Sequence, residues 1–129
     1  MDENKKLIML VDDSVANLRI GKNLLAGSYT VATAPSAAKL ISLMESNTPA
    51  LILLDVDMPE INGYEIIKIL KSKDSTKNIP VIFLTAHSES AAEEKAFSLG
   101  AVDYITKPFQ KEHLLDRIEH YIKETEKTD

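Results

Sequence analysis

The chain has 129 residues, a length that suits a single domain with a buried core. Apolar residues make up 44% of the sequence and charged residues 27%, which is the ordinary balance of a soluble globular domain. The formal net charge of −5 argues against a nucleic-acid-binding surface on this chain. Because the sequence contains no cysteine, disulfides, thiolate metal sites and thiol catalysis are excluded.

The N-terminal segment MDENKK is followed by one short apolar run, LIMLV, which ends at two aspartates. This run is too short for a membrane span, and its acidic end does not fit a signal peptide. We therefore predict a cytoplasmic protein with no membrane partner.

Five short apolar or β-branched runs alternate with longer amphipathic stretches. The runs occupy residues 7–11, 29–34, 51–54, 81–84 and 103–106. The first, third and fourth runs are apolar throughout, which is typical of parallel strands that are covered on both faces.

Helical patterns fill the intervals between these runs. They span residues 14–26, 36–46, 64–70 and 90–99, and a fifth follows Lys107-Pro108 and continues through Ile122. Ser14 is a plausible N-cap and Gly100 suits the residue after a helix end. Strands that alternate with helices predict a parallel sheet with helices on both faces. We expect one domain over residues 1–125 and a polar tail, or the start of a linker, over 126–129.

Chemically active residues follow four of the predicted strands. Asp12 and Asp13 follow the first strand, Asp55 the third, Thr85 the fourth and Lys107 the fifth. Since the carboxyl ends of parallel strands meet at one edge of a sheet, these side chains should converge there.

Three converging carboxylates would repel one another, and a divalent cation relieves that repulsion. Mg²⁺ takes carboxylate, carbonyl and water oxygens, so we expect a Mg²⁺ site, with Mn²⁺ as an alternative ion. A carboxylate beside a metal ion and a lysine can attack a phosphoryl group and form an acyl phosphate.

Four motifs together resemble the receiver domain of two-component response regulators. They are VDDS at 11–14, LDVDMPEINGYE at 54–65, LTA at 84–86 and DYITKPF at 103–109. The resemblance covers nearly the whole chain. It implies a flavodoxin-like, doubly wound (βα)5 fold with strand order 2-1-3-4-5, and two helices on one face and three on the other. It also implies that a sensor histidine kinase or a phosphotransfer protein phosphorylates Asp55.

The same resemblance implies a role for each matching residue. Asp12, Asp13, Asp55 and the backbone carbonyl of Asp57 would bind Mg²⁺, and Lys107, in a cis peptide bond with Pro108, would neutralise the phosphoryl group. Thr85 and Tyr104 would act as a switch. They would change the surface of the fourth helix, fifth strand and fifth helix, which would contact a downstream protein, a fused output domain or a second copy of the chain.

Asp57 and His87 are expected to modulate the lifetime of the phosphoryl group, because they match positions that flank the route of attacking water. Each residue taken alone also has a simpler interpretation. Asp12, Asp13, Asp55 and Thr85 could cap helices or turns, Tyr104 could be a packing residue, and His87 a solvated loop residue. His113, His120 and the pair Glu93-Glu94 are predicted to lie on solvated helix faces.

Other functions are compatible with parts of the sequence. The Asp-x-Asp of LDVDMP also occurs in phosphatases of the haloacid-dehalogenase type, but there the motif precedes the other carboxylates, the reverse of the order found here. A flavin-binding electron carrier would need a hydroxyl- and glycine-rich loop where this chain has Asp-Asp-Ser. A receiver-like interaction module that works without phosphorylation would not require all five of the strand-end residues. We therefore expect a signalling switch with self-phosphorylation and self-dephosphorylation chemistry and not an enzyme that acts on a metabolite.

Overall fold

The computed structural model describes residues 5–56, 63–85, 90–107 and 110–127. Five parallel strands form one sheet in the order β2-β1-β3-β4-β5. The strands are β1 (Leu7–Val11), β2 (Thr30–Ala34), β3 (Leu51–Asp55), β4 (Val81–Thr85) and β5 (Asp103–Thr106). This order and the parallel pairing confirm the fold that the sequence predicted.

A helix connects each strand to the next, and a fifth helix follows the last strand. They are α1 (Val15–Leu25), α2 (Ala37–Met44), α3 (Gly63–Lys71), α4 (Ser90–Ser98) and α5 (Lys111–Lys127). Ser14 and Ser36 cap the first two helices, since each side-chain oxygen accepts a hydrogen bond from a backbone N–H three residues later.

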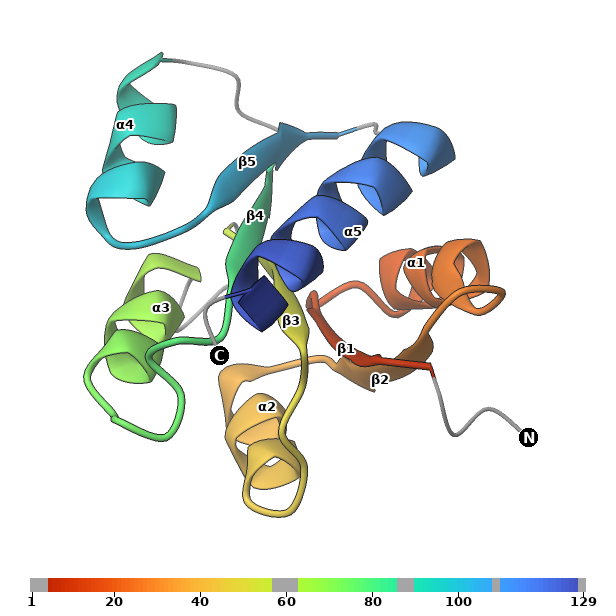
Figure 1. Ribbon diagram of the computed structural model, residues 1–129, viewed down its shortest axis with the longest axis horizontal. Coiled ribbons are helices and arrows are strands. Elements are labelled where there is room, and N and C mark those ends of the chain that lie inside the picture. Colours follow the sequence, from red (N-terminus) through yellow and green to blue (C-terminus); the bar gives the residue numbers. More distant parts are fainter. Residues whose placement is uncertain (1–4, 57–62, 86–89, 108–109, 128–129) are drawn as a thin grey trace.

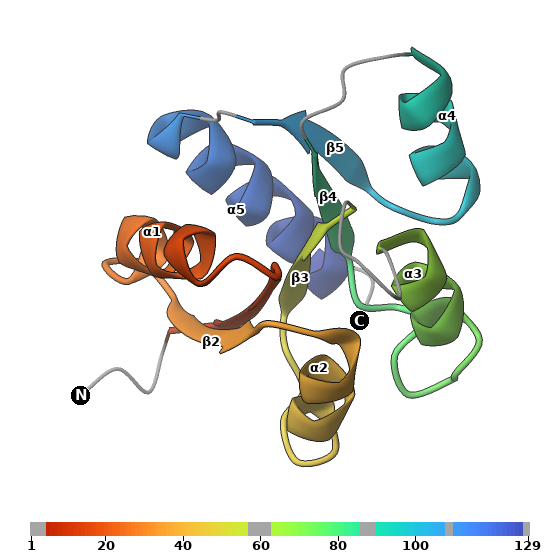
Figure 2. The ribbon, with the colours of Figure 1, turned by 180° about the vertical axis from the view of Figure 1, so that it is seen from behind.

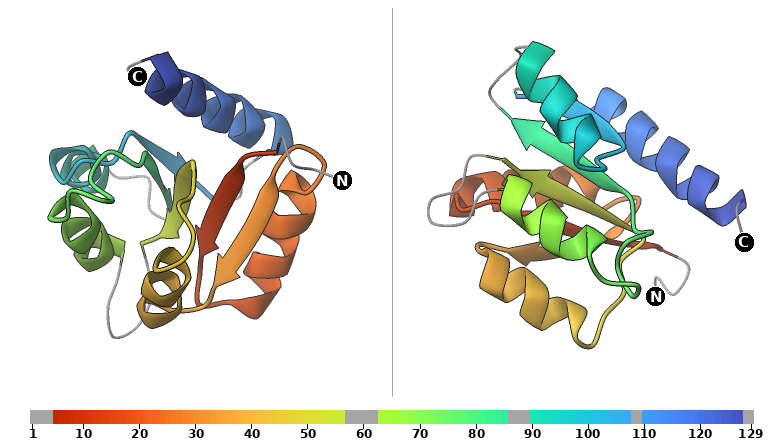
Figure 3. Two further views of the ribbon diagram at one scale, coloured as in Figure 1. Left: turned by 60° about the horizontal axis from the view of Figure 1, so that its bottom comes forward. Right: turned by 90° about the vertical axis from the view of Figure 1, so that its left-hand side faces the viewer.

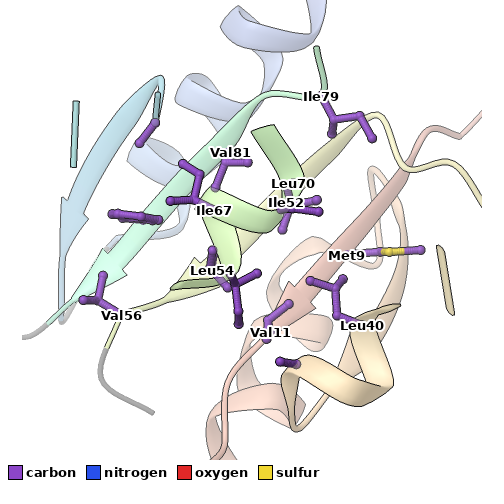
Figure 4. Packing of buried hydrophobic residues seen from close by; sticks show 14 of the residues in the cluster. Met9, Val11, Leu40, Ile52, Leu54, Val56, Ile67, Leu70, Ile79 and Val81 are labelled. Carbon is purple, nitrogen blue, oxygen red and sulfur yellow. The ribbon is translucent and has the colours of Figure 1, made fainter. Parts of the chain in front are cut away.

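The sheet lies between two layers of helices (Figures 1 and 2). Helices α1 and α5 cover one face, and α2, α3 and α4 cover the other; the left view of Figure 3 shows the sheet between them. Alternate residues of each central strand face opposite layers: Leu10 packs with α1 and α5, whereas Met9 and Val11 pack with α2 and α3. Figure 4 shows the second of these two layers, where Leu40 of α2 and Ile67 and Leu70 of α3 lie over the strands.

The three central strands are buried at almost every position, which explains why their sequences are apolar throughout. β3 and β4 each end in a polar residue that is nonetheless buried, Asp55 at 3% exposure and Thr85 at 1%. The fold therefore buries two polar side chains at the carboxyl edge of the sheet.

Element boundaries differ slightly from those expected. β3 extends through Asp55, because the ladder to β4 continues to the pair Asp55–Leu84. α5 continues to Lys127, whereas the helical pattern in the sequence was followed only through Ile122. None of the helices in the described part of the chain has the length and apolar character needed to span a bilayer.

Candidate phosphoacceptor and metal site

The acidic site lies where the backbone hydrogen bonds of the sheet end. Asp12 directly follows β1, and its N–H donates to the carbonyl of Ala34 at the end of β2 (3.1 Å). Lys107 directly follows β5, and its N–H donates to the carbonyl of Thr85 (2.7 Å). The backbone ladder thus fixes the Cα positions from which the polar side chains of the site extend.

Among the described residues, three carboxylates gather at this edge. Asp12, Asp13 and Asp55 each offer an oxygen such that these atoms all lie within 4.8 Å of one another. Asp12 and Asp55 are buried, whereas Asp13 is exposed. Hard carboxylate oxygens in this spacing fit a divalent cation such as Mg²⁺, which accepts oxygen ligands and retains several waters.

Lys107 joins two of the carboxylates. Its ammonium nitrogen lies 3.3 Å from Oδ2 of Asp12 and 3.4 Å from Oδ1 of Asp55. Burial by itself lowers the pKa of Lys107. The negative charges of Asp55 and Asp12, together with the hydrogen bonds to them, raise the pKa by more than burial lowers it, so the net shift is upward. Lys107 is therefore a fixed positive charge at neutral pH.

Asp12 is also held by α1. Its Oδ1 accepts a hydrogen bond from the N–H of Ser14 (2.9 Å), and its Oδ2 accepts one from the side-chain amide of Asn17 (3.3 Å). Asn17 was not among the site residues predicted from the sequence. Its signal was its place three residues after the N-cap, from which a side chain reaches back towards the helix start.

Gly63 approaches the end of β3 closely. A Cβ at this position would lie 2.7 Å from the carbonyl oxygen of Asp55 and 2.9 Å from Cα of Val56. The N–H of Gly63 donates to the carbonyl of Val56 (3.2 Å). The absence of a side chain here lets α3 begin against the backbone of Asp55, a requirement that the sequence indicated only as a turn.

An apolar cavity of about 430 Å³ adjoins the acidic site on the α1 side. Leu10, Leu24 and Leu84 contribute to its wall, and Asp12, Asn17 and Lys107 lie at its polar part. Apolar walls reduce the local dielectric screening, so the charges of Asp12 and Lys107 act on each other more strongly than they would in water.

The remaining predicted site residues fall into two groups. Thr85 is buried at the carboxyl edge, and Tyr104 is half-buried, lies opposite Phe83 in the β4–β5 register and packs against the core under α2, α3 and α4. Asp57, His87 and Pro108 lie outside the described residues. His113, His120, Glu93 and Glu94 are exposed on helices, as expected.

Comparison with known proteins identifies one family. Residues 8–119 match the response regulator receiver domain. The chain is 37% identical over 121 residues to a probable cyclic di-GMP phosphodiesterase of Vibrio cholerae. The matched region covers 94% of this chain but only 27% of that protein. It is 31% identical over 118 residues to the polar-differentiation response regulator DivK of Brucella anthropi, covering 91% of this chain and 96% of DivK.

Solved structures show the same fold. A CheY-like response regulator receiver domain protein from Methanospirillum hungatei superimposes with a TM-score of 0.88 at 27% sequence identity, covering 98% of this chain and all of that one. The similarity thus extends over the whole sheet and both helix layers.

Proposed function

Because the chain belongs to the response regulator receiver domain family, we propose that it is a signalling switch that is phosphorylated on Asp55. One observation carries this proposal. The buried carboxylate of Asp55 has the ammonium group of Lys107 at 3.4 Å, and it offers an oxygen within 4.8 Å of carboxylate oxygens of Asp12 and Asp13. A buried carboxylate so placed is poised for nucleophilic attack on a phosphoryl group.

The proposed donor is the phosphohistidine of a sensor kinase or of a phosphotransfer protein. An oxygen of Asp55 attacks the phosphorus, the new P–O bond forms as the P–N bond breaks, and the imidazole leaves with the bonding electrons and takes up a proton. Lys107 neutralises one phosphoryl oxygen from its position between Asp12 and Asp55.

Asp12, Asp13 and Asp55 would hold a Mg²⁺ or Mn²⁺ ion, because their oxygens form the hard ligand set that both ions accept. Such an ion would neutralise charge on the transferring phosphoryl group. The backbone carbonyl of Asp57 stays a predicted ligand, and Asp57 and His87 stay predicted modulators of the phosphoryl lifetime.

The output surface is proposed to comprise α4, β5 and α5. Thr85 would hydrogen-bond the new phosphoryl group and Tyr104 would reorient, since both lie on the adjacent strands β4 and β5. Helix α4 makes few buried contacts with the rest of the domain, because among its described side chains only Ala96 is buried. In addition, the ammonium group of Lys95 lies over the ring of Tyr64, 4.2 Å from the ring centroid. A helix with so few buried contacts can shift at a small cost in packing.

This surface would contact a downstream protein, a fused output domain or a second copy of the chain. The chain spans 27% of the length of the Vibrio relative and 96% of DivK, so its relatives include receivers both with and without large additional segments. We further propose that it has no turnover of metabolites and works in the cytoplasm, where sensor kinases phosphorylate their partners.

The direct test is intact mass spectrometry after incubation with acetyl phosphate. We expect one added phosphoryl group that requires Mg²⁺ and is absent from Asp55→Asn. Asp74→Asn is the matched control, because the side chain of Asp74 is 96% exposed and lies outside the cluster. If wild type gained no group, a phosphorylation-independent interaction module would become the better interpretation. If Asp55→Asn gained the group as wild type does, the acceptor would be a residue other than Asp55.

A further inference from the structure

Asn17 occupies a defined place between α1 and the acidic site. It is the third residue of α1, and its backbone N–H donates to the hydroxyl oxygen of the N-cap Ser14 (3.2 Å). The N–H of Ser14 in turn donates to Oδ1 of Asp12 (2.9 Å). These two hydrogen bonds fix the start of the helix against Asp12, so the side chain of Asn17 points back to the carboxylate from a rigid backbone.

Three donors in the described part of the chain bind Asp12, and the amide of Asn17 is one of them. Ser14 binds Oδ1, whereas Asn17 Nδ2 and Lys107 Nζ both bind Oδ2, each at 3.3 Å. The two donors on Oδ2 differ in kind. Lys107 is charged and is shared with Asp55, whereas the amide of Asn17 is neutral and comes from another part of the fold.

This difference matters when the charge at the site changes. A divalent cation at the three carboxylates repels the ammonium group of Lys107, and a phosphoryl group on Asp55 attracts it. Either event moves the ammonium group of Lys107 away from Asp12 or weakens the hydrogen bond between them. A neutral amide experiences neither force to a comparable degree, so we expect the hydrogen bond from Asn17 to Asp12 to persist.

We propose that Asn17 is a positioning residue for Asp12. It holds the carboxylate in the orientation that binds a divalent cation, and it keeps that orientation when Lys107 moves towards a phosphoryl group. The first of these roles concerns metal binding alone, and the second rests on the proposed function. Hydrogen-bond partners of metal ligands typically contribute a factor of about 10–100 to metal affinity.

The simpler interpretation is that Asn17 is an exposed residue of the first helical turn. Asn23 offers a matched control, because it lies on the same helix and is also exposed. Replacing either residue with alanine raises helix propensity in a similar way. Only Asn17→Ala removes a donor from Asp12.

The test is a titration of the full chain with Mg²⁺ in the absence of a phosphodonor. Binding is monitored through the amide NMR shifts of Asp12 and Asp13. We expect Asn17→Ala to raise the Kd for Mg²⁺ by about 10-fold. Asn23→Ala should stay within about twofold of wild type. Equal Mg²⁺ affinity in the two variants would overturn the proposal.

A second variant separates hydrogen bonding from packing. Asn17→Asp keeps the shape but replaces the donor with a carboxylate that faces Asp12. We expect it to have a lower Tm than Asn17→Ala in metal-free, low-salt buffer, and we expect saturating Mg²⁺ to close that gap. Matching Tm values for the two variants in metal-free buffer would contradict the donor role.

Both readouts are independent of phosphorylation. Weaker Mg²⁺ binding in Asn17→Ala would support the positioning role even if Asp55 were never phosphorylated. If the chain were not phosphorylated but Asn17→Ala still bound Mg²⁺ more weakly, the proposed function and the second role of Asn17 would fail, whereas its role in metal binding would stand.

Discussion

The ammonium nitrogen of Lys107 lies 3.4 Å from Oδ1 of Asp55, although 52 positions separate the two residues in the sequence. The same nitrogen lies 3.3 Å from Oδ2 of Asp12. One lysine therefore neutralises part of the charge of two buried carboxylates at the end of the sheet. This sharing makes Lys107 a competitor of any cation that binds there.

Removal of the lysine charge should strengthen metal binding. We predict that Lys107→Met lowers the Kd for Mg²⁺ by about tenfold, equivalent to about 1.4 kcal/mol, because the repulsion between ammonium and metal is lost. Lys111→Met, which removes an exposed charge at the start of α5, is the control and should change the Kd little. Calorimetric titration without phosphodonor measures both, and weaker binding in Lys107→Met would contradict this account.

The pKa of Lys107 predicts a pH dependence of stability. Because its pKa is raised in the folded state, the stabilisation is fully present below the unfolded-state pKa of about 10.4 and is lost as pH rises through the folded-state pKa. In metal-free buffer, wild type should therefore lose more unfolding free energy than Lys107→Met between about pH 10 and 12. Denaturant melts across this range test the difference, and parallel curves would argue against the ion pairs.

Gly63 should tolerate no side chain. Gly63→Ala places a Cβ against the backbone of Asp55 and Val56, so we expect a loss of about 1–3 kcal/mol of unfolding free energy and slower phosphorylation of Asp55. Gly27→Ala is the matched control, since a Cβ there meets nothing within 4 Å. Urea melts of the two variants would show similar losses if the close approach were unimportant.

Thr85 should transmit the state of Asp55 to Tyr104. With Mg²⁺ and beryllofluoride, which mimics a phosphoryl group, we expect amide shifts in α4 and at Tyr104 that are reduced several-fold in Thr85→Ala, because the hydroxyl is lost. Thr85→Ser keeps the hydroxyl and should retain most of the response. An α4 region that is unchanged in wild type would refute the switch.

The sequence predicted the fold well because its strongest patterns coincide with burial. The uniform apolar runs of β1, β3 and β4 are buried on both faces, and they were correctly interpreted as parallel strands. The strand order came from the resemblance to receiver domains, since periodicity alone does not fix which strands are neighbours.

The supporting residues of the site were harder to predict. Asn17 contacts Asp12, and Gly63 lies against the backbone of Asp55. Both contacts depend on how α1 and α3 pack against the sheet. A helix-start asparagine and a turn glycine have common local explanations, so their positions in the sequence did not identify the carboxylates that they approach. Only the packed arrangement of helices and strands brings them to the carboxylates.

Locating the phosphoryl group on the chain tests whether Asp55 is the acceptor. The chain would be incubated with acetyl phosphate and Mg²⁺ and then reduced with borohydride, which converts an aspartyl phosphate to homoserine. Peptide fragmentation would then identify the modified residue. We predict homoserine at position 55 in the wild-type chain and none at Asp12 or Asp13. Homoserine at position 12 or 13, with none at position 55, would contradict the assignment of Asp55 as the acceptor.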